Sequence, residues 1–111
     1  MSKRKKRRAE MPGSRADNCV VVTTPSGNTY RIDREALDDW TFVDLASNVQ
    51  DDGGSNASTV AMVRYFLANI LSPEDASKVE RAATSPSGRV LSSKVIAEAL
   101  AILTGISQGN S

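Results

Sequence analysis

The chain has 111 residues, with 14 Lys or Arg against 13 Asp or Glu, and its formal net charge is +1. This length favours one domain rather than two, and the low aromatic content of 5% favours a modest, aliphatic core. Six of the basic residues lie within the first eight positions, which leaves 8 basic against 13 acidic residues in the remainder. We therefore expect an acidic domain that follows a basic N-terminal tail.

The cysteine content and the hydropathy pattern indicate the cellular compartment in which the protein is expected. The single cysteine, Cys19, excludes an intrachain disulfide and favours a reducing environment. No apolar run approaches the roughly 20 residues that cross a bilayer. No apolar segment of signal-peptide length follows the basic N-terminus. We expect a soluble cytosolic protein without a membrane partner.

The reactive groups of common enzymes are scarce. There is no histidine, so Ser-His-Asp and Cys-His arrangements are excluded, and one cysteine cannot build a structural zinc site. No glycine-rich phosphate loop is present. The segment 51–56 has two aspartates and two glycines, but the acid that would close a calcium loop falls in apolar sequence. We predict a protein that is not an enzyme, without catalytic residues, cofactor or metal.

Residues 1–17 are charged, contain Pro12-Gly13 and lack an apolar period, which predicts a disordered tail. A solvated tail is the favoured interpretation, and contact with nucleic-acid phosphates or an acidic partner is the alternative. The residues that would make such contacts are Lys3, Arg4, Lys5, Lys6, Arg7 and Arg8. The net negative charge of residues 9–111 opposes binding of this part of the chain to nucleic-acid phosphates. A DNA-binding helix-turn-helix is therefore not favoured.

A β-hairpin is predicted over residues 18–32. The β-branched run 19–23 is strand-like, Pro25 to Asn28 form a turn, and 29–32 supply the returning strand. A lone hairpin is marginal in water, so it must dock on helices or pair with another chain.

The middle of the chain predicts helices. A short turn over 34–37 precedes a helix over 40–49, which Asp38 or Asp39 caps and which Trp40 anchors in the core. After a hinge at 51–56, a central helix covers 57–71. Its apolar stripe is wide, which is typical of a helix with neighbours on several sides. Val60, Val63, Leu67, Ile70 and Leu71 form a first stripe, and Met62, Phe66 and Ile70 form a second.

Two further helices complete the chain. Ser72 and Pro73 open a helix that reaches about Ala83. Ser92 or Ser93 caps a last helix over 94–103, which Gly105 stops. The expected fold is mainly α (α+β), a short N-terminal hairpin followed by about four helices in a small bundle. The expected domain spans 18–106, and residues 107–111 fray.

The order of these elements resembles the tail assembly chaperones of long-tailed bacteriophages, particularly those of Gram-positive hosts. The resemblance covers roughly residues 19–104. It rests on the Pro/Gly hairpin turn, the acidic approach to a Trp-containing helix at 38–46, the Ser-Pro-Glu-Asp helix start at 72–75 and the Ser-Gly-Arg-Val break at 87–90.

This resemblance implies a non-enzymatic protein of the host cytoplasm that binds the tape measure protein and keeps it soluble. The tail tube protein, which later polymerises around that client, is a further partner. The resemblance also implies self-association, a longer frameshifted form and absence from the finished particle. Met62, Phe66 and Ile70 are then a candidate surface for a second copy or the client, whereas for Phe66 an intrachain core position is favoured.

Two rival functions remain open at the level of the sequence. The protein could be a structural component of the tail or head–tail connector, in which the hairpin pairs edge to edge in a ring. It could instead be a basic-tailed nucleic-acid accessory protein that acts through residues 3–8.

Overall fold

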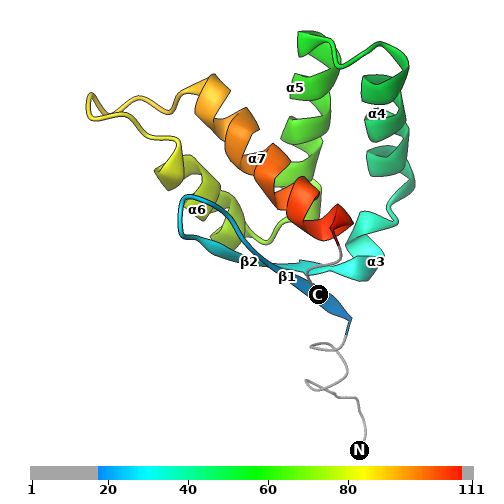
Figure 1. Cartoon of the computed structure of the whole chain (residues 1–111), viewed down its shortest axis with the longest axis horizontal. Coiled ribbons are helices and arrows are strands. Elements are labelled where there is room, and N and C mark those ends of the chain that lie inside the picture. Colours follow the sequence, from blue (N-terminus) through cyan, green and yellow to red (C-terminus); the bar gives the residue numbers. More distant parts are fainter. Residues whose placement is uncertain (1–17, 109–111) are drawn as a thin grey trace, which may run out of the picture.

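The computed structural model describes residues 18–108, which form a hairpin followed by helices (Figure 1). Its elements are β1 (Cys19–Thr23), β2 (Thr29–Asp33), α3 (Arg34–Leu37), α4 (Trp40–Asp51), α5 (Asn56–Tyr65), the π-helical segment η1 (Phe66–Ile70), α6 (Pro73–Ala82) and α7 (Ser92–Ser107). The predicted fold class, mainly helical with an N-terminal hairpin, is confirmed. The predictions for the tail 1–17 and for 109–111 lie outside the described residues.

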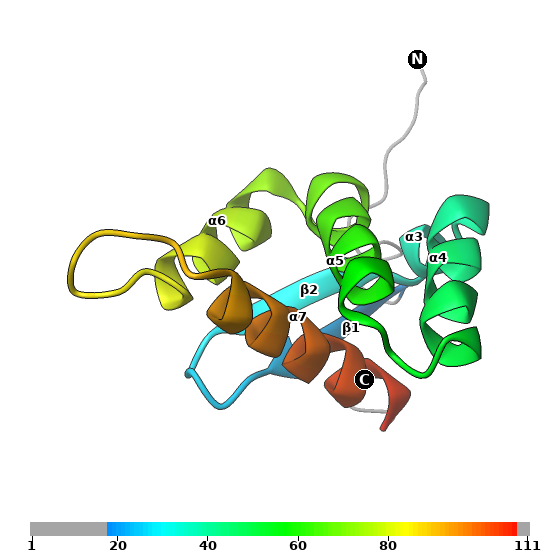
Figure 2. The same ribbon diagram turned by 90° about the horizontal axis from the view of Figure 1, so that it is seen from above.

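The hairpin is one layer and the helices are the other. β1 and β2 pair antiparallel, with Val21 opposite Arg31. Pro25 opens the connecting turn, and Gly27 has a φ of 92°, which a residue with a side chain rarely adopts. Val20 and Val22 turn inward and are buried, whereas Val21 between them is exposed. The helices lie on the inward face of the ribbon, and α7 crosses above it (Figures 1 and 2).

The hydrophobic core lies between the hairpin and the helices. Its largest fully buried side chains include Tyr30 and Ile32 from β2, Phe66 from η1 and Ile102 from α7. The Phe42 ring of α4 reaches Phe66, with a distance of 5.7 Å between ring centroids. Side chains far apart in the sequence therefore share one core, which is expected of a domain of this size.

The central helix changes its winding at Phe66. The N–H of Leu71 donates to the C=O of Phe66 at 3.0 Å, five residues back, which is the π-helical bond. The wider turn shifts the direction of the side chains that follow it. Phe66, Ile70 and Leu71 are all buried, although the first and the last are five positions apart.

Two of the predicted helix starts are confirmed, and one is not. Asp39 is the N-cap of α4, and its carboxylate accepts a hydrogen bond from the N–H of Phe42 at 3.0 Å. Ser72 caps α6, and Pro73 takes the first helical position. The prediction that Ser92 or Ser93 caps the last helix is wrong. The N-cap of α7 is Leu91, and no side chain caps that end.

The prediction that Gly105 stops the last helix is also wrong, because α7 continues to Ser107. Gly105 is buried where α7 meets β1. A Cβ atom added at Gly105 would lie 2.5 Å from Cγ1 of Val22. The glycine therefore permits a close approach of helix to strand instead of ending the helix. Ser107, which we expected to fray, belongs to the helix.

The connection between α4 and α5 is organised around Asp52. Its carboxylate accepts hydrogen bonds from the N–H groups of Gly54 and Ser55, at 3.2 and 3.0 Å, and from the hydroxyl groups of Ser55 and Ser58. The hydroxyl of Ser58 is the main cause that lowers the pKa of Asp52 to about 2. The segment predicted as a hinge thus carries a defined set of local hydrogen bonds.

Candidate functional site

The second stripe of the central helix lies inside the domain. Met62, Phe66 and Ile70 are 5%, 0% and 6% exposed, and all three belong to the core cluster. Their spacing of four residues keeps the three side chains on one face of the central helix, and that face packs in the core. A surface role for the three residues is therefore not available in this structure, and the intrachain-core alternative describes their position. A client or a second copy must meet other residues.

Part of the first stripe, in contrast, lines a groove between the central helix and α7, which we call the α5–α7 groove. Val60 and Leu67 are partly buried there, whereas the other residues of this stripe are buried. Val60, Val63 and Leu67 form one wall, and Val95 and Ile96 form the other. The groove has a volume of about 330 Å³, and its lining also includes Arg64, Val90 and Ser92. Its walls are almost entirely aliphatic, so the groove suits apolar side chains better than a polar small molecule.

Val90 gives this groove an exposed apolar rim. It lies just before α7, pairs with Thr84 in an isolated β-bridge and is 50% exposed. The sequence reasoning missed Val90, because an apolar residue in a predicted break carries no periodic signal. Val95 and Ile96 were found as the stripe of the last helix, but their place in a groove depends on how α7 crosses α5.

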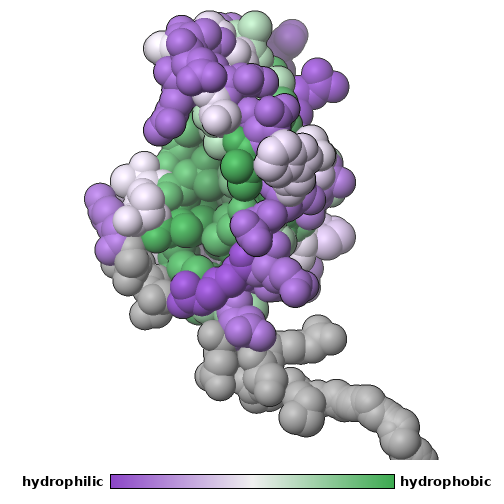
Figure 3. Space-filling model, turned by 90° about the vertical axis from the view of Figure 1, so that its right-hand side faces the viewer, coloured by the Kyte–Doolittle hydropathy of each residue, from purple (hydrophilic) through white to green (hydrophobic). Residues whose placement is uncertain are grey.

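A second apolar area lies on the adjacent face. Figure 3 shows hydrophobic side chains gathered in a hollow bordered by α4 and the C-terminal end of α7. The partly buried apolar residues of these two elements include Leu45, Val49, Leu103 and Ile106. On α7, Leu100 is 38% exposed. Polar side chains surround this hollow in Figure 3, an arrangement that is typical of interaction surfaces.

The prediction that Trp40 anchors the core is wrong, because this side chain is 81% exposed. Trp40 begins α4, and Val43 lies one turn further along the helix and is 43% exposed. The face of α4 that enters the core starts at Phe42 instead. A largely exposed tryptophan beside an exposed valine gives α4 an apolar outer side.

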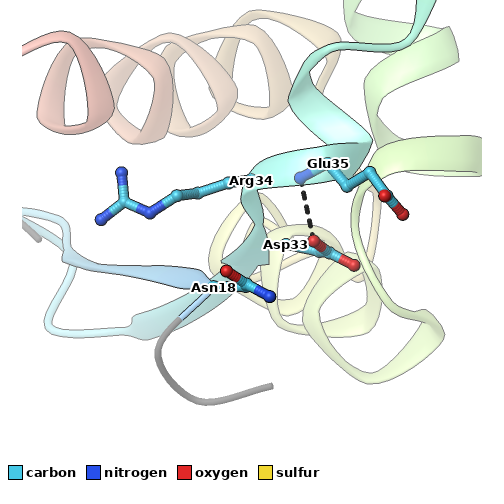
Figure 4. Close-up of a pocket in the computed structure, with 4 residues that line it drawn as sticks. All are labelled: Asn18, Asp33, Arg34 and Glu35. Atoms are coloured by element: carbon cyan, nitrogen blue, oxygen red, sulfur yellow. Dashed lines mark hydrogen bonds between the residues drawn. The ribbon is translucent and has the colours of Figure 1, made fainter. Parts of the chain in front are cut away.

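A polar depression lies at the end of the hairpin (Figure 4). Asn18, Asp33, Arg34 and Glu35 line it, and its volume is about 390 Å³. The N–H of Glu35 donates to Asp33 at 2.9 Å, which makes Asp33 the N-cap of α3. The side chains of Arg34 and Glu35 extend in opposite directions (Figure 4). The capping role accounts for the position of the Asp33 carboxylate. The four side chains do not converge on a common point (Figure 4).

Glu98 of α7 is a buried carboxylate that is hydrogen-bonded to the hairpin and its turn. Its Oε2 atom accepts hydrogen bonds from the hydroxyl groups of Thr24, Tyr30 and Ser26 at 2.6, 2.6 and 2.8 Å. Burial by itself raises the pKa of Glu98, but these hydrogen bonds outweigh burial and hold the pKa below its ordinary value. Burial is also the main cause that raises the pKa of Tyr30. The cluster joins the hairpin to α7.

Side chains of α6 cover the outer edge of β2. The N–H of Arg31 donates to the Asp75 carboxylate at 3.1 Å, and the Lys78 ammonium donates to the C=O of Thr29 at 2.8 Å. Lys78 and Asp75 also form an ion pair at 3.4 Å. Two outward backbone groups of this edge, the N–H of Arg31 and the C=O of Thr29, thus have partners on α6.

Comparison of the chain with protein-family models, with curated proteins and with solved structures found no match.

Within residues 18–108, no cluster of three or more Asp, Glu or Cys side chains has the geometry to hold a metal ion. The described helices include none that is long and apolar enough to span a membrane. The basic residues Lys3, Arg4, Lys5, Lys6, Arg7 and Arg8 lie outside the described part of the chain, so their contact with nucleic acid stays a prediction.

Proposed function

We propose that the protein is a phage tail assembly chaperone that binds apolar helical segments of the tape measure protein and keeps them soluble. The observation that carries this proposal is the α5–α7 groove, in which Val60, Leu67, Val95 and Ile96 are only partly buried and the rim residue Val90 is 50% exposed. An amphipathic client helix would insert side chains spaced by three and four residues. The order of sequence elements supports the choice of client.

The surroundings of the groove fit a reversible partner of this kind. Val90 widens the apolar rim, and Arg64 offers a charge at the edge that can pair with an acidic residue of the client. The area is small, so one groove takes a few side chains and not a whole helix. Several copies along a long client are therefore needed to cover it.

The connector alternative is less well supported by the geometry. A ring built by edge pairing needs a head-to-tail contact, in which one hairpin edge of each subunit receives the opposite edge of the next. Asp75 and Lys78 already occupy the edge of β2. The presence of the protein in purified particles, measured by mass spectrometry, would favour the connector, and its absence would favour the chaperone.

Co-expression with a phage tape measure protein, the proposed client, tests the proposal. Val90→Asp places a charge in the apolar rim of the groove, so the soluble fraction of the client should fall at least tenfold. Val43→Asp is the matched control, because its side chain has similar exposure on a different surface and should leave the soluble fraction unchanged. Circular dichroism is the control measurement that checks that both variants fold.

Three outcomes would contradict the proposal. A client that is equally soluble with and without the wild-type chain removes the chaperone function. A client that is equally soluble with wild type and Val90→Asp removes the groove as its binding site. Loss of nucleic-acid binding after deletion of residues 1–10, with no effect on the client in any variant, would favour the accessory-protein alternative.

A further inference from the structure

The outer edge of β1 differs from that of β2. In an antiparallel pair, the backbone groups of alternate residues point toward the partner strand and those between them point away. The N–H of Arg34 donates to the C=O of Asn18 at 2.8 Å, which sets this alternation. The backbone N–H and C=O groups of Cys19, Val21 and Thr23 therefore point away from β2.

These outward groups have no hydrogen-bond partner among residues 18–108. β1 also lacks the features that usually protect a free edge, because no charged residue, proline or bulge interrupts Cys19–Thr23. Val21 at its centre is 42% exposed. Within residues 18–108, Asp75 and Lys78 cover part of the β2 edge, and the β1 edge is open.

We infer that β1 pairs with β1 of a second copy of this chain, antiparallel and about a twofold axis at Val21. In this register Val21 lies opposite Val21 of the other copy, and Cys19 lies opposite Thr23. All the outward N–H and C=O groups of the three residues then find partners in the other strand. The two hairpins become one four-stranded antiparallel sheet with helices on the same face.

A second copy fits this edge better than an unrelated strand for physical reasons. The strand carries no charge, so two copies meet without repulsion, and the exposed valines form a β-branched cross-strand pair. Two strands alone are marginal, whereas four form a stable sheet. The covered edge of β2 prevents further addition, so assembly closes at a dimer and does not extend into a fibre.

Molar mass in solution, measured by light scattering on the full chain, tests this dimer. Val21→Pro removes the outward N–H at the twofold axis but no hydrogen bond of the hairpin itself. We expect a dimer for the wild type and a monomer for Val21→Pro at the same concentration. Val21→Thr keeps both the N–H and the β-branched shape, so it should remain a dimer.

Cross-linking tests the register. In a Cys19→Ser background, Val21→Cys places two thiols directly opposite each other, within reach of a disulfide. Oxidation should convert it to a covalent dimer. Thr29→Cys in the same background is the matched control, because it shares the outer face but lies on the covered edge, and it should stay monomeric under denaturing conditions.

Two results would overturn the inference. One is a wild-type chain that is monomeric at about 100 µM, and the other is a dimer that persists in Val21→Pro and does not cross-link through Val21→Cys. No residue of β1 lines the α5–α7 groove, so Val21→Pro should still solubilise the tape measure client. A failure of the dimer is thereby distinguishable from a failure of the chaperone function.

Discussion

Gly105 sets the distance between α7 and β1. Most positions on a helix have room for a Cβ atom. At Gly105, however, a Cβ atom would lie 2.5 Å from a methyl group of Val22. Val22 is buried and β-branched, so it cannot rotate away freely. The absence of a side chain at one residue thus decides how closely the last helix packs on the first strand.

Gly105→Ala should destabilise the protein, although alanine is the better helix former by about 1 kcal/mol. Overpacking a buried contact costs about 1–3 kcal/mol, so we expect a net loss of about 1 kcal/mol in the free energy of unfolding. Urea denaturation measures this loss. In a Val22→Ala background the added methyl group has space, and the same change should be neutral or stabilising. Equal losses in both backgrounds would show that Val22 does not cause the effect.

Among the elements, α4 depends on Asp39 for its start and its position. The Asp39 carboxylate caps the helix, and it also accepts a bond at 3.0 Å from the hydroxyl of Tyr65 on α5. Burial and this hydrogen bond raise the pKa of Tyr65. One carboxylate therefore links the beginning of α4 to the helix that α4 packs against.

Asp39→Ala should lower the free energy of unfolding by about 1–2 kcal/mol, because it removes a helix cap and the acceptor for Tyr65. Asp38→Ala is the control in the adjacent position. Asp38 is the C-cap of α3 through its backbone N–H, and its exposed side chain takes no part in that cap, so the change should stay within about 0.5 kcal/mol of wild type. Thermal or urea unfolding measures both. Equal effects of the two substitutions would contradict the capping role of Asp39.

At the scale of the whole molecule, Glu98 joins the first and last elements. Three hydroxyl groups of the hairpin and its turn converge on one oxygen of this carboxylate, across more than 65 positions in the sequence. Without the carboxylate these buried donors lose their acceptor, which costs on the order of 1–3 kcal/mol. Glu98→Ala should therefore destabilise the domain by about that amount, and the hairpin should lose protection from hydrogen exchange.

The same cluster predicts a pH dependence. The pKa of folded Glu98 lies below its ordinary value of 4.5, so its stabilising effect is complete above that pH and is lost as the pH falls through the folded-state pKa. Glu98→Gln does not titrate, and the difference in free energy of unfolding between it and wild type should shrink as the pH falls below about 4.5. Urea titrations between pH 7 and 3 measure this difference. A difference that is constant over that range would contradict the role of the charge.

The sequence by itself determined the local structure of this protein. Proline and glycine in the hairpin turn, a capping Asp39 and the Ser72-Pro73 start all act within a few residues, so their effects can be read from neighbours in the chain. The apolar period located the central helix for the same reason. Local patterns also gave the correct mainly helical class with an N-terminal hairpin.

Only the tertiary structure decided which surfaces remain free. Met62, Phe66 and Ile70 formed a candidate surface stripe, but their face of the central helix packs in the core. Part of the first stripe, Val60 and Leu67, lines the α5–α7 groove instead. Trp40 has a hydrophobic ring and yet lies outside, because α4 presents Phe42 to the core. Burial depends on which elements meet across the fold, and neither a residue's hydrophobicity nor its spacing specifies those long-range contacts.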